Sequence, residues 1–245
     1  MRIALVSDIH GNLPALEAVV KDIARHNVDA VVNLGDSLSG PLLPLETAQF
    51  LMTQDWVHLA GNHERQLLSE DPEKWGLSDQ FTHAQLTKKE LDWLATLGPC
   101  QLFSPEVLLC HGTPSDDKTY FLETVEATHV RAASLSEIDA RLGRVDAELI
   151  ACGHTHVPRV MCASTGQLIV NPGSVGLQAY DDTNPHPHVI ETGTPEARYA
   201  IVERRTDGWI ASLIAIPYAW RTMAELAMTR HRADWASALL TGRLA

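Results

Sequence analysis

Short apolar runs, each followed at once by glycine and polar residues, recur along the chain and restrict the folds open to it. The first of these runs, which have the composition of buried strands, are residues 2–7, 30–34 and 56–60. Between them, apolar side chains at helical spacing follow a capping residue, Asn12, and residues 45–54 show a second helical pattern. The first half of the chain is therefore predicted to be an α/β unit.

The second half is richer in strands, after a mostly helical stretch that runs to residue 97. Its strand-like runs are residues 107–110, 149–152, 159–163, 167–170, 197–203 and 209–216. A helix is expected over residues 135–142, between the first two of these strands. An α/β unit followed by further strands predicts two packed sheets flanked by helices.

Two segments near the end of the chain are expected to differ from this pattern. Residues 181–195 contain three prolines and a glycine, so a long loop is predicted there, favoured as a surface loop over a substrate lid. One domain is expected over residues 1–216, with residues 217–245 as a helical tail packed on it. The tail carries no motif that indicates a function.

Charge and composition exclude several classes of protein. The sequence has 31 acidic and 19 basic side chains, a formal charge of −12, which argues against general nucleic-acid binding but not against a small phosphorylated substrate at a metal site. No apolar run approaches the roughly 20 residues that a membrane span requires. The four cysteines form no C-x-x-C pair, so a reduced cytoplasmic protein is expected.

Polar side chains that can bind a metal follow five of the predicted strands. They are Asp8, His10, Asp36, Asn62, His111, His154 and His156. Ligands of α/β sheets bind beyond the carboxyl ends of the strands, so these side chains are expected to converge. Oxygen and imidazole donors without a thiolate suit divalent ions such as Mn²⁺, Fe²⁺, Zn²⁺ or Ni²⁺. Seven donors exceed one tetrahedral site and fit two ions bridged by a carboxylate, for which Asp36 is the natural candidate.

Each motif taken alone has a simpler interpretation. Asp-x-His is commonly a loop cap beside a surface histidine, and Gly-Asp before a helix is commonly a turn with a helix cap. His154 and His156 alternate on a segment expected to be extended, so they also suit a buried, hydrogen-bonded pair. Gly-Asn-His-Glu at residues 61–64 is more specific. The occurrence of all five motifs in order, each after a strand, favours a metal site.

The ordered motifs resemble those of the calcineurin-like metallophosphoesterases, and above all their small prokaryotic branch of predicted phosphodiesterases. The residues that carry the resemblance are Asp8-x-His10, Gly35-Asp36, Gly61-Asn62-His63-Glu64, His111, Gly153-His154-x-His156 and the runs 7–13 and 171–176. The resemblance extends to about residue 205. It implies an α/β (α+β) fold, a four-layer αββα sandwich, with a dinuclear metal site at the carboxyl ends of the strands.

The resemblance also implies roles for the site residues. One ion would be held by Asp8, His10, Asp36 and His156, and the other by Asp36, Asn62, His111 and His154. A metal-bridging hydroxide would attack phosphorus in line. His63 would bind no metal and would protonate the leaving oxygen or stabilise charge on the phosphoryl group. Glu64 is expected either to orient a histidine or to be a solvated carboxylate at a helix start.

Arginines that related protein phosphatases have beside their motifs are missing here, and their absence narrows the choice of substrate. The arginines that adjoin two of their motifs are replaced here by Leu-Ser-Gly at residues 38–40 and by Ala60, so a nucleotide-like phosphodiester is predicted over a phosphomonoester. Arg65 is either a substitute for these arginines or an exposed helix residue. Ser174 lies in a loop that either binds an anion or makes a tight turn.

Several alternatives stay open at this point. Mn²⁺ is favoured as the metal, and Fe, Zn, Ni, Co and Mg are the other candidates. The same site would serve a phosphomonoesterase or protein phosphatase, a nucleotide pyrophosphohydrolase, or a metal-binding scaffold without catalysis. The sequence carries no signal for an oligomeric state.

Overall fold

The computed structural model describes residues 1–69 and 71–245. Its strands are β1 (Arg2–Val6), β2 (Ala30–Asn33), β3 (Val57–His58), β4 (Cys100–Ser104), β5 (Val107–Cys110), β6 (Glu123–Val125), β7 (Val130–Ala132), β8 (Leu149–Ala151), β9 (Arg159–Cys162), β10 (Leu168–Asn171), β11 (Ala179–Asp182), β12 (His188–Glu191), β13 (Ala197–Arg205) and β14 (Gly208–Ile216). Its helices are α1 (Leu13–Ile23), α2 (Pro44–Leu51), α3 (Asn62–Ser69), α4 (Leu77–Gln85), α5 (Lys88–Leu94), α6 (Leu135–Leu142), α7 (Trp220–Thr229) and α8 (Ala233–Thr241), and a 3₁₀ turn spans Pro72–Lys74.

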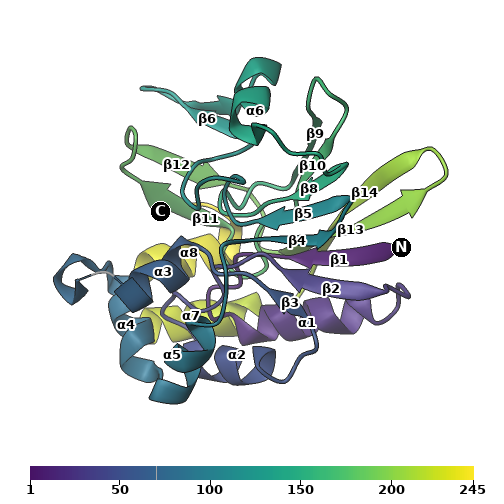
Figure 1. Cartoon of the computed structure of the whole chain (residues 1–245). Helices are drawn as coiled ribbons and strands as arrows, with labels where there is room; N and C mark the ends of the chain where they lie inside the picture. Colours follow the sequence, from purple (N-terminus) through teal and green to yellow (C-terminus); the bar gives the residue numbers. More distant parts are fainter. Residues whose placement is uncertain (70) are drawn as a thin grey trace.

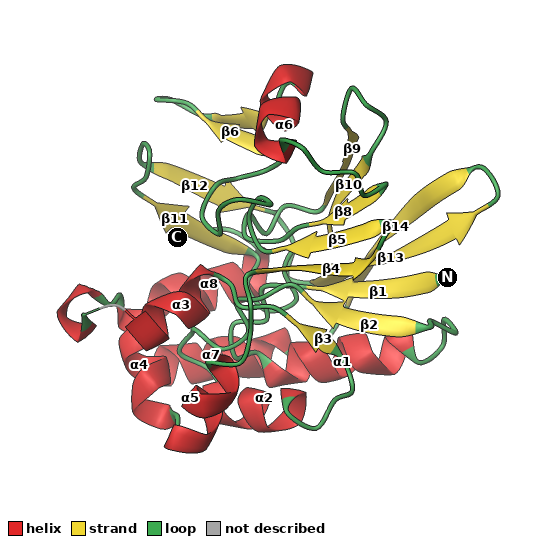
Figure 2. Cartoon of the chain, in the orientation of Figure 1, coloured by secondary structure: helices red, strands yellow, loops and turns green. Residues whose placement is uncertain are grey.

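Two five-stranded sheets packed face to face form the centre of the fold (Figures 1 and 2). The first has the order β14-β13-β1-β2-β3 and the second the order β4-β5-β8-β10-β9. Leu5 and Leu149 belong to the apolar core between them. Leu16 of α1 packs on the outer face of the first sheet, and Ile138 of α6 packs on the outer face of the second. This arrangement confirms the predicted four-layer αββα sandwich.

Parallel pairing within each sheet brings the functional loops to one edge. In the first sheet β1 pairs in parallel with β2, and β2 with β3. In the second sheet β5 and β10 both pair in parallel with β8. The carboxyl ends of parallel strands lie at the same edge, so the loops after these strands can meet.

Helix α1 begins where the sequence predicts, because Asn12 caps it. The Asn12 side chain accepts a hydrogen bond from the Ala15 backbone N–H at 3.3 Å, and a proline occupies the first turn. The apolar stripe that follows, which includes Leu16 and Val19, is fully buried. Capping and periodicity therefore agree, and α1 is fixed against β1 and β13.

The prediction of a long loop over residues 181–195 is wrong. β11 and β12 pair as an antiparallel hairpin, in which Ala179 lies opposite Glu191. Pro185 and Pro187, which suggested a loop, lie in the turn between the two strands, where they remove no ladder hydrogen bond. β4, β6 and β7 were also not predicted, because their residues are partly exposed and form no continuous apolar run.

The C-terminal helices pack on the same body as the sheets. Trp235 and Leu239 of α8 share an apolar cluster with Met223 of α7 and with Leu42 and Leu177, which lie in loops at the edge of the sheets. α7 and α8 therefore lie beside the carboxyl ends of the strands (Figure 1). In the described part of the chain, no helix combines the length and apolarity required to cross a membrane.

We expect Gly40→Ala to destabilise the fold by about 1–3 kcal/mol through overpacking. An added Cβ at Gly40 would lie 2.5 Å from Cη2 of Trp235 and 2.6 Å from the backbone oxygen of His10. Gly98→Ala is the matched control, because its Cβ would meet only the Cys100 oxygen, at 3.9 Å. Urea unfolding followed by circular dichroism measures both changes; equal midpoints for the two variants would contradict the packing of Trp235 against Gly40.

Candidate metal centre

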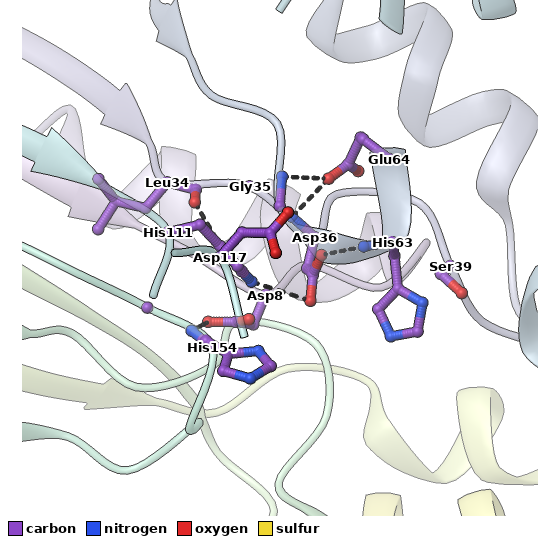
Figure 3. Close-up of polar contacts among 12 residues, drawn as sticks. Asp8, Leu34, Gly35, Asp36, Ser39, His63, Glu64, His111, Asp117 and His154 are labelled. Atoms are coloured by element: carbon purple, nitrogen blue, oxygen red, sulfur yellow. Dashed lines mark hydrogen bonds and ion pairs between the residues drawn. The ribbon is translucent and has the colours of Figure 1, made fainter. Parts of the chain in front are cut away.

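The polar residues predicted to converge do so, at the shared edge of the two sheets: six of them form two donor groups, and Asn62 lines the same cavity. Figure 3 shows four of the seven, Asp8, Asp36, His111 and His154. Asp8 and Asp36 follow β1 and β2, and His111 follows β5. Within the described residues, five of the seven non-glycine residues with positive φ belong to this site; they are Asp8, His10, Asp36, His154 and His156. Such backbone costs about 1 kcal/mol or more per residue and persists where surrounding contacts hold it.

A first group of donors combines Asp8, His10 and His156, whose ligand atoms lie within 4.8 Å of one another. Nδ1 of His10 donates to the Ser39 carbonyl at 2.6 Å, and Nδ1 of His156 donates to the Leu177 carbonyl at 2.8 Å. A carbonyl can only accept, so each ring carries its proton on Nδ1 and presents the lone pair of Nε2. The two Nε2 atoms face each other at 3.0 Å, an arrangement that a cation between them would stabilise.

A second group combines Asp36, His111 and His154 within the same 4.8 Å limit. Nδ1 of His111 donates to the Leu34 carbonyl at 2.8 Å, which leaves its Nε2 as the ligand atom, 3.1 Å from Oδ2 of Asp36. His154 has the opposite tautomer: its Nε2 donates to the Lys118 carbonyl at 2.9 Å and its Nδ1 is the ligand atom. Both rings are therefore oriented as metal-binding histidines are, by a partner on the other nitrogen.

His154 and His156 belong to different donor groups, so the alternative of a buried, hydrogen-bonded pair is wrong. Their backbone is left-handed, with φ of 69° and 59°, and not extended as the alternation suggested. The turn sends one imidazole to each donor group. The backbone N–H of His154 also donates to Oδ2 of Asp8 at 3.1 Å, which fixes that carboxylate.

Three buried polar atoms at the site have no hydrogen-bond partner among the described residues. They are Oδ1 of Asp8, Oδ1 of Asn62 and Nε2 of His111. A buried polar atom without a partner destabilises the fold by about 1–3 kcal/mol, so three in one place require an explanation. Divalent cations provide it, because each of these atoms is a lone-pair donor. The donor set therefore fits bound metal, and Asn62 joins the two groups as a further candidate ligand.

The electrostatics keep the imidazoles of His10 and His154 in the metal-binding form, whereas at His111 burial is outweighed by nearby negative charge, above all that of Asp36, which raises the pKa to about 10. Burial and the neighbouring His156 lower the pKa of His10 to about 4. Burial and the neighbouring His111 lower the pKa of His154 to about 4. Both rings are therefore neutral at pH 7, the form in which a histidine coordinates a cation.

His63 lies at the edge of the donor groups and belongs to neither. Its backbone N–H donates to Oδ1 of Asp36 at 3.0 Å (Figure 3), and its Nδ1 is 2.8 Å from Oδ1 of Asp79. Burial disfavours its charged form, yet the charge of Asp36 and the hydrogen bond to Asp79 raise the pKa of His63 to about 9. Sequence reasoning missed Asp79, which carries no motif and sits in the first turn of α4.

Glu64 neither orients a histidine nor faces solvent, so both expectations for it are wrong. It is fully buried, and its carboxylate accepts hydrogen bonds from the backbone N–H groups of Asp36 at 2.9 Å, Ser37 at 2.8 Å and Gly61 at 2.7 Å. These three donors belong to the loops after β2 and β3. Glu64 therefore joins the two loops that carry Asp36 and Asn62.

The contacts of Ser174 and Arg65 do not suit the substrate-binding roles considered for them. Ser174 is fully buried; its hydroxyl donates to the Asp8 carbonyl at 2.7 Å and accepts from the Leu177 N–H at 2.8 Å, which makes a tight turn and corrects the substrate assignment. Arg65 makes a bidentate ion pair with Asp117, at 2.7 Å and 3.1 Å. It is not among the residues that line the cavity at the site, so the expectation that it replaces the missing arginines is not supported.

The family model described as calcineurin-like phosphoesterase matches residues 1–158, more than half of the chain. The chain belongs to this family. Membership identifies it as a phosphoesterase, and the family implies divalent metal ions.

Two solved structures share the fold over nearly the whole chain, and a further protein is similar in sequence over most of it. The metallophosphoesterase of Sphaerobacter thermophilus is 24% identical, with a TM-score of 0.75 over 99% of this chain and 100% of that one. The hypothetical protein PH1004 of Pyrococcus horikoshii is 16% identical, with a TM-score of 0.76 over 100% and 99%. The uncharacterised protein MJ0912 of Methanocaldococcus jannaschii is 24% identical over 213 residues, which are 77% of this chain and 81% of the relative.

A cavity of about 1050 Å³ opens on the donor groups of this phosphoesterase. His10, Asp36 and His63 line its base. Its walls come from segments that sequence reasoning left without a role: Tyr120 from the loop after β5, Tyr180 from the β11–β12 hairpin, and Arg232 and Trp235 from the C-terminal segment. These residues carry no motif, and only the fold brings them to the site.

The two wall tyrosines form a polar relay with His188. Nδ1 of His188 is 2.8 Å from the His186 carbonyl and donates to it, so its Nε2 accepts from the Tyr120 hydroxyl at 3.0 Å. The Tyr180 hydroxyl then donates to that of Tyr120 at 2.6 Å. The Tyr180 ring packs on His156, with ring centroids 4.7 Å apart, so the hairpin supports the metal centre from the side.

We expect Asp36→Asn to lose both metal ions, because Asp36 lies against His111 of one group and its charge acts on His10 of the other. The neutral amide removes the attraction for a second cation. Metal content per chain after dialysis, measured by mass spectrometry, should fall from two to below about 0.2. Asp55→Asn, on the surface outside the cavity, should keep both. One ion retained by Asp36→Asn would show that Asp36 serves a single position.

Proposed function

We propose that the protein hydrolyses phosphodiesters of small, nucleotide-like substrates with two divalent cations, Mn²⁺ being favoured. The observation that carries the proposal is the pair of donor groups whose histidine protons are directed outward to carbonyls while the ligand atoms face inward. When bound, such cations polarise phosphoryl oxygens and acidify water. Oxygen and imidazole donors without a thiolate suit Mn²⁺.

The ligand sets follow the two groups and the bridging position. One cation is assigned to Asp8, His10, Asp36 and His156, and the other to Asp36, Asn62, His111 and His154. His154 and Asp8 are additionally tied together by a backbone hydrogen bond at 3.1 Å, so the two sets hold a fixed relation. This rigidity supports catalysis over a passive scaffold, because positioned groups act only when held within fractions of an ångström.

His63 is the residue assigned to the leaving group. Asp79 accepts from Nδ1, so the nitrogen that remains for the substrate is Nε2. The side chain is 27% exposed and lines the cavity, whereas Asp79 is buried and also accepts from the Ser39 hydroxyl at 2.5 Å. A buried, doubly engaged carboxylate holds the imidazole in one orientation. His63 is thereby placed to deliver a proton from Nε2 to the departing oxygen.

The size of the cavity supports a diester. A diester carries a substituent on each side of phosphorus, and about 1050 Å³ is the upper end of the range for small-molecule sites, with room for both. The absence of arginine at residues 38–40 and at Ala60 points the same way, because it removes the charges that bind a monoester dianion in related protein phosphatases.

We expect the Mn²⁺-restored protein to hydrolyse bis-p-nitrophenyl phosphate faster than p-nitrophenyl phosphate. The measurement is kcat/KM for both esters at equal metal loading, with Asp36→Asn as the blank. A preference for the monoester would replace the proposal by a phosphomonoesterase. Turnover of nucleoside diphosphate linkages but of neither ester would indicate a pyrophosphohydrolase, and two bound ions without any turnover would indicate a scaffold.

We expect His63→Ala to keep its metals and to lose roughly 10²–10⁴ in kcat on a diester with a poor leaving group, because proton delivery is lost. The loss should be far smaller with bis-p-nitrophenyl phosphate, since nitrophenolate departs without a proton. Equal losses on both esters would assign His63 to stabilising charge on the phosphoryl group. His83→Ala serves as a control, because His83 lies on α4 outside the cavity.

A further inference from the structure

The C-terminal segment, which carries no motif, reaches the edge of the metal centre. Trp235, in the first turn of α8, places its ring 6.0 Å from that of His10, edge to face. Arg232 precedes α8 and lines the same cavity as His63. Its side chain is only 16% exposed, and its guanidinium lies 5.6 Å from the centre of the Trp235 ring. An arginine so far buried beside a phosphoesterase site requires a reason.

The contacts of Arg232 orient its guanidinium and leave donors unused. Nε and Nη2 donate to the Asp234 carboxylate, at 3.0 Å and 2.6 Å, and Nη1 donates to the Ser78 hydroxyl at 3.0 Å. An arginine has five N–H groups. Among the described residues these contacts engage three of them, so Nη1 and Nη2 each retain one. Two adjacent donors on a planar group match two oxygens of a phosphate.

Arg232 is joined to the wall that holds His63. Ser78, which accepts from Arg232, directly precedes Asp79, which fixes His63. Both side chains are therefore positioned by the first turn of α4. Asp234 is about half exposed, so solvent screens its charge more than it screens the buried guanidinium. Asp234 also lines the cavity, so an anion is held there only through the N–H groups of Nη1 and Nη2 that the carboxylate and Ser78 do not engage.

We propose that Arg232 binds a phosphate group of the substrate through Nη1 and Nη2, which makes the C-terminal segment part of the active site. The inference rests on the proposed function and adds a recognition residue to it. The positions beside Gly61 and after Asp36 still carry no arginine, so Arg232, from a segment some 170 residues further along the chain, supplies one guanidinium where the related protein phosphatases have two, which suits the single charge of a diester. Arg65 does not take this place, since it pairs with Asp117.

The test is binding of inorganic phosphate to the full-length, Mn²⁺-loaded protein, measured by calorimetry without turnover. We expect Arg232→Gln to weaken phosphate binding about tenfold or more, the effect of losing charge-assisted hydrogen bonds. Arg232→Lys should weaken it several-fold, because the charge stays but the paired donors are lost. Arg221→Gln, an exposed position on α7 outside the cavity, should bind as the wild type does.

Metal content and melting temperature are recorded for every variant, so that loss of the site itself is recognised. Should Arg232→Gln fail to fold, Arg232→Lys decides the question alone. Phosphate binding unchanged in a folded, metal-loaded Arg232 variant overturns the proposal, and so does a wild type that binds no phosphate. Arg232-dependent phosphate binding together with no ester hydrolysis would keep this inference and refute the proposed function. Arg232-independent binding with normal hydrolysis would do the reverse.

Discussion

The candidate metal centre depends on one buried carboxylate, Glu64, that belongs to neither donor group. Glu64 accepts three backbone N–H groups, from Asp36, Ser37 and Gly61, and so holds the loop after β2 against the loop after β3. The approach is so close that a Cβ on Gly61 would lie 2.2 Å from Oδ1 of Asp36. Burial and the nearby Asp36 raise the pKa of Glu64, and the hydrogen bonds from Gly61 and Ser37 oppose that shift. The same hydrogen bonds fix the backbone positions from which the Asp36 and Asn62 side chains extend, independently of any metal ion.

Glu64 holds the loops of the site, and backbone carbonyls orient the histidine rings. Four histidines of the site each give a ring proton to a carbonyl from another part of the chain; the acceptors are Leu34, Ser39, Lys118 and Leu177. Each bond decides which ring nitrogen faces inward, and it decides differently for His154 than for the other three. The tautomers are therefore set by loop conformation and not by the side chains nearby. Five site residues have a left-handed backbone, which is strained, and these hydrogen bonds help to hold it.

The site contains two kinds of residue, those that need one chemical type and those that act through their position, and only the first kind could be predicted from the sequence. Residues that must be of one chemical type, such as Asp8 and His111, stand out because they follow apolar strands, and their convergence and the four-layer fold were predicted correctly. Residues that act through position were not found. Asp79 and Arg232 look like ordinary helix-start residues, and only the fold brings Asp79 to Ser39 and Arg232 to Ser78. The β11–β12 hairpin was hidden by prolines that belong only to its turn.

The charge of the protein shows why a residue that acts through its position, such as Arg232, matters at this site. The chain has a formal charge of −12, and the centre itself contributes the carboxylates of Asp8 and Asp36, so an anionic phosphate is repelled by the protein taken as a whole. Attraction must come from charges within a few ångströms of the phosphate, where low dielectric strengthens them. In the proposed site, cations would reverse the sign of the charge at the base of the cavity, and the Arg232 guanidinium adds a positive group at its wall, beside Asp234. An acidic phosphoesterase can thus reject polyanionic surfaces at long range and still accept a small phosphorylated substrate.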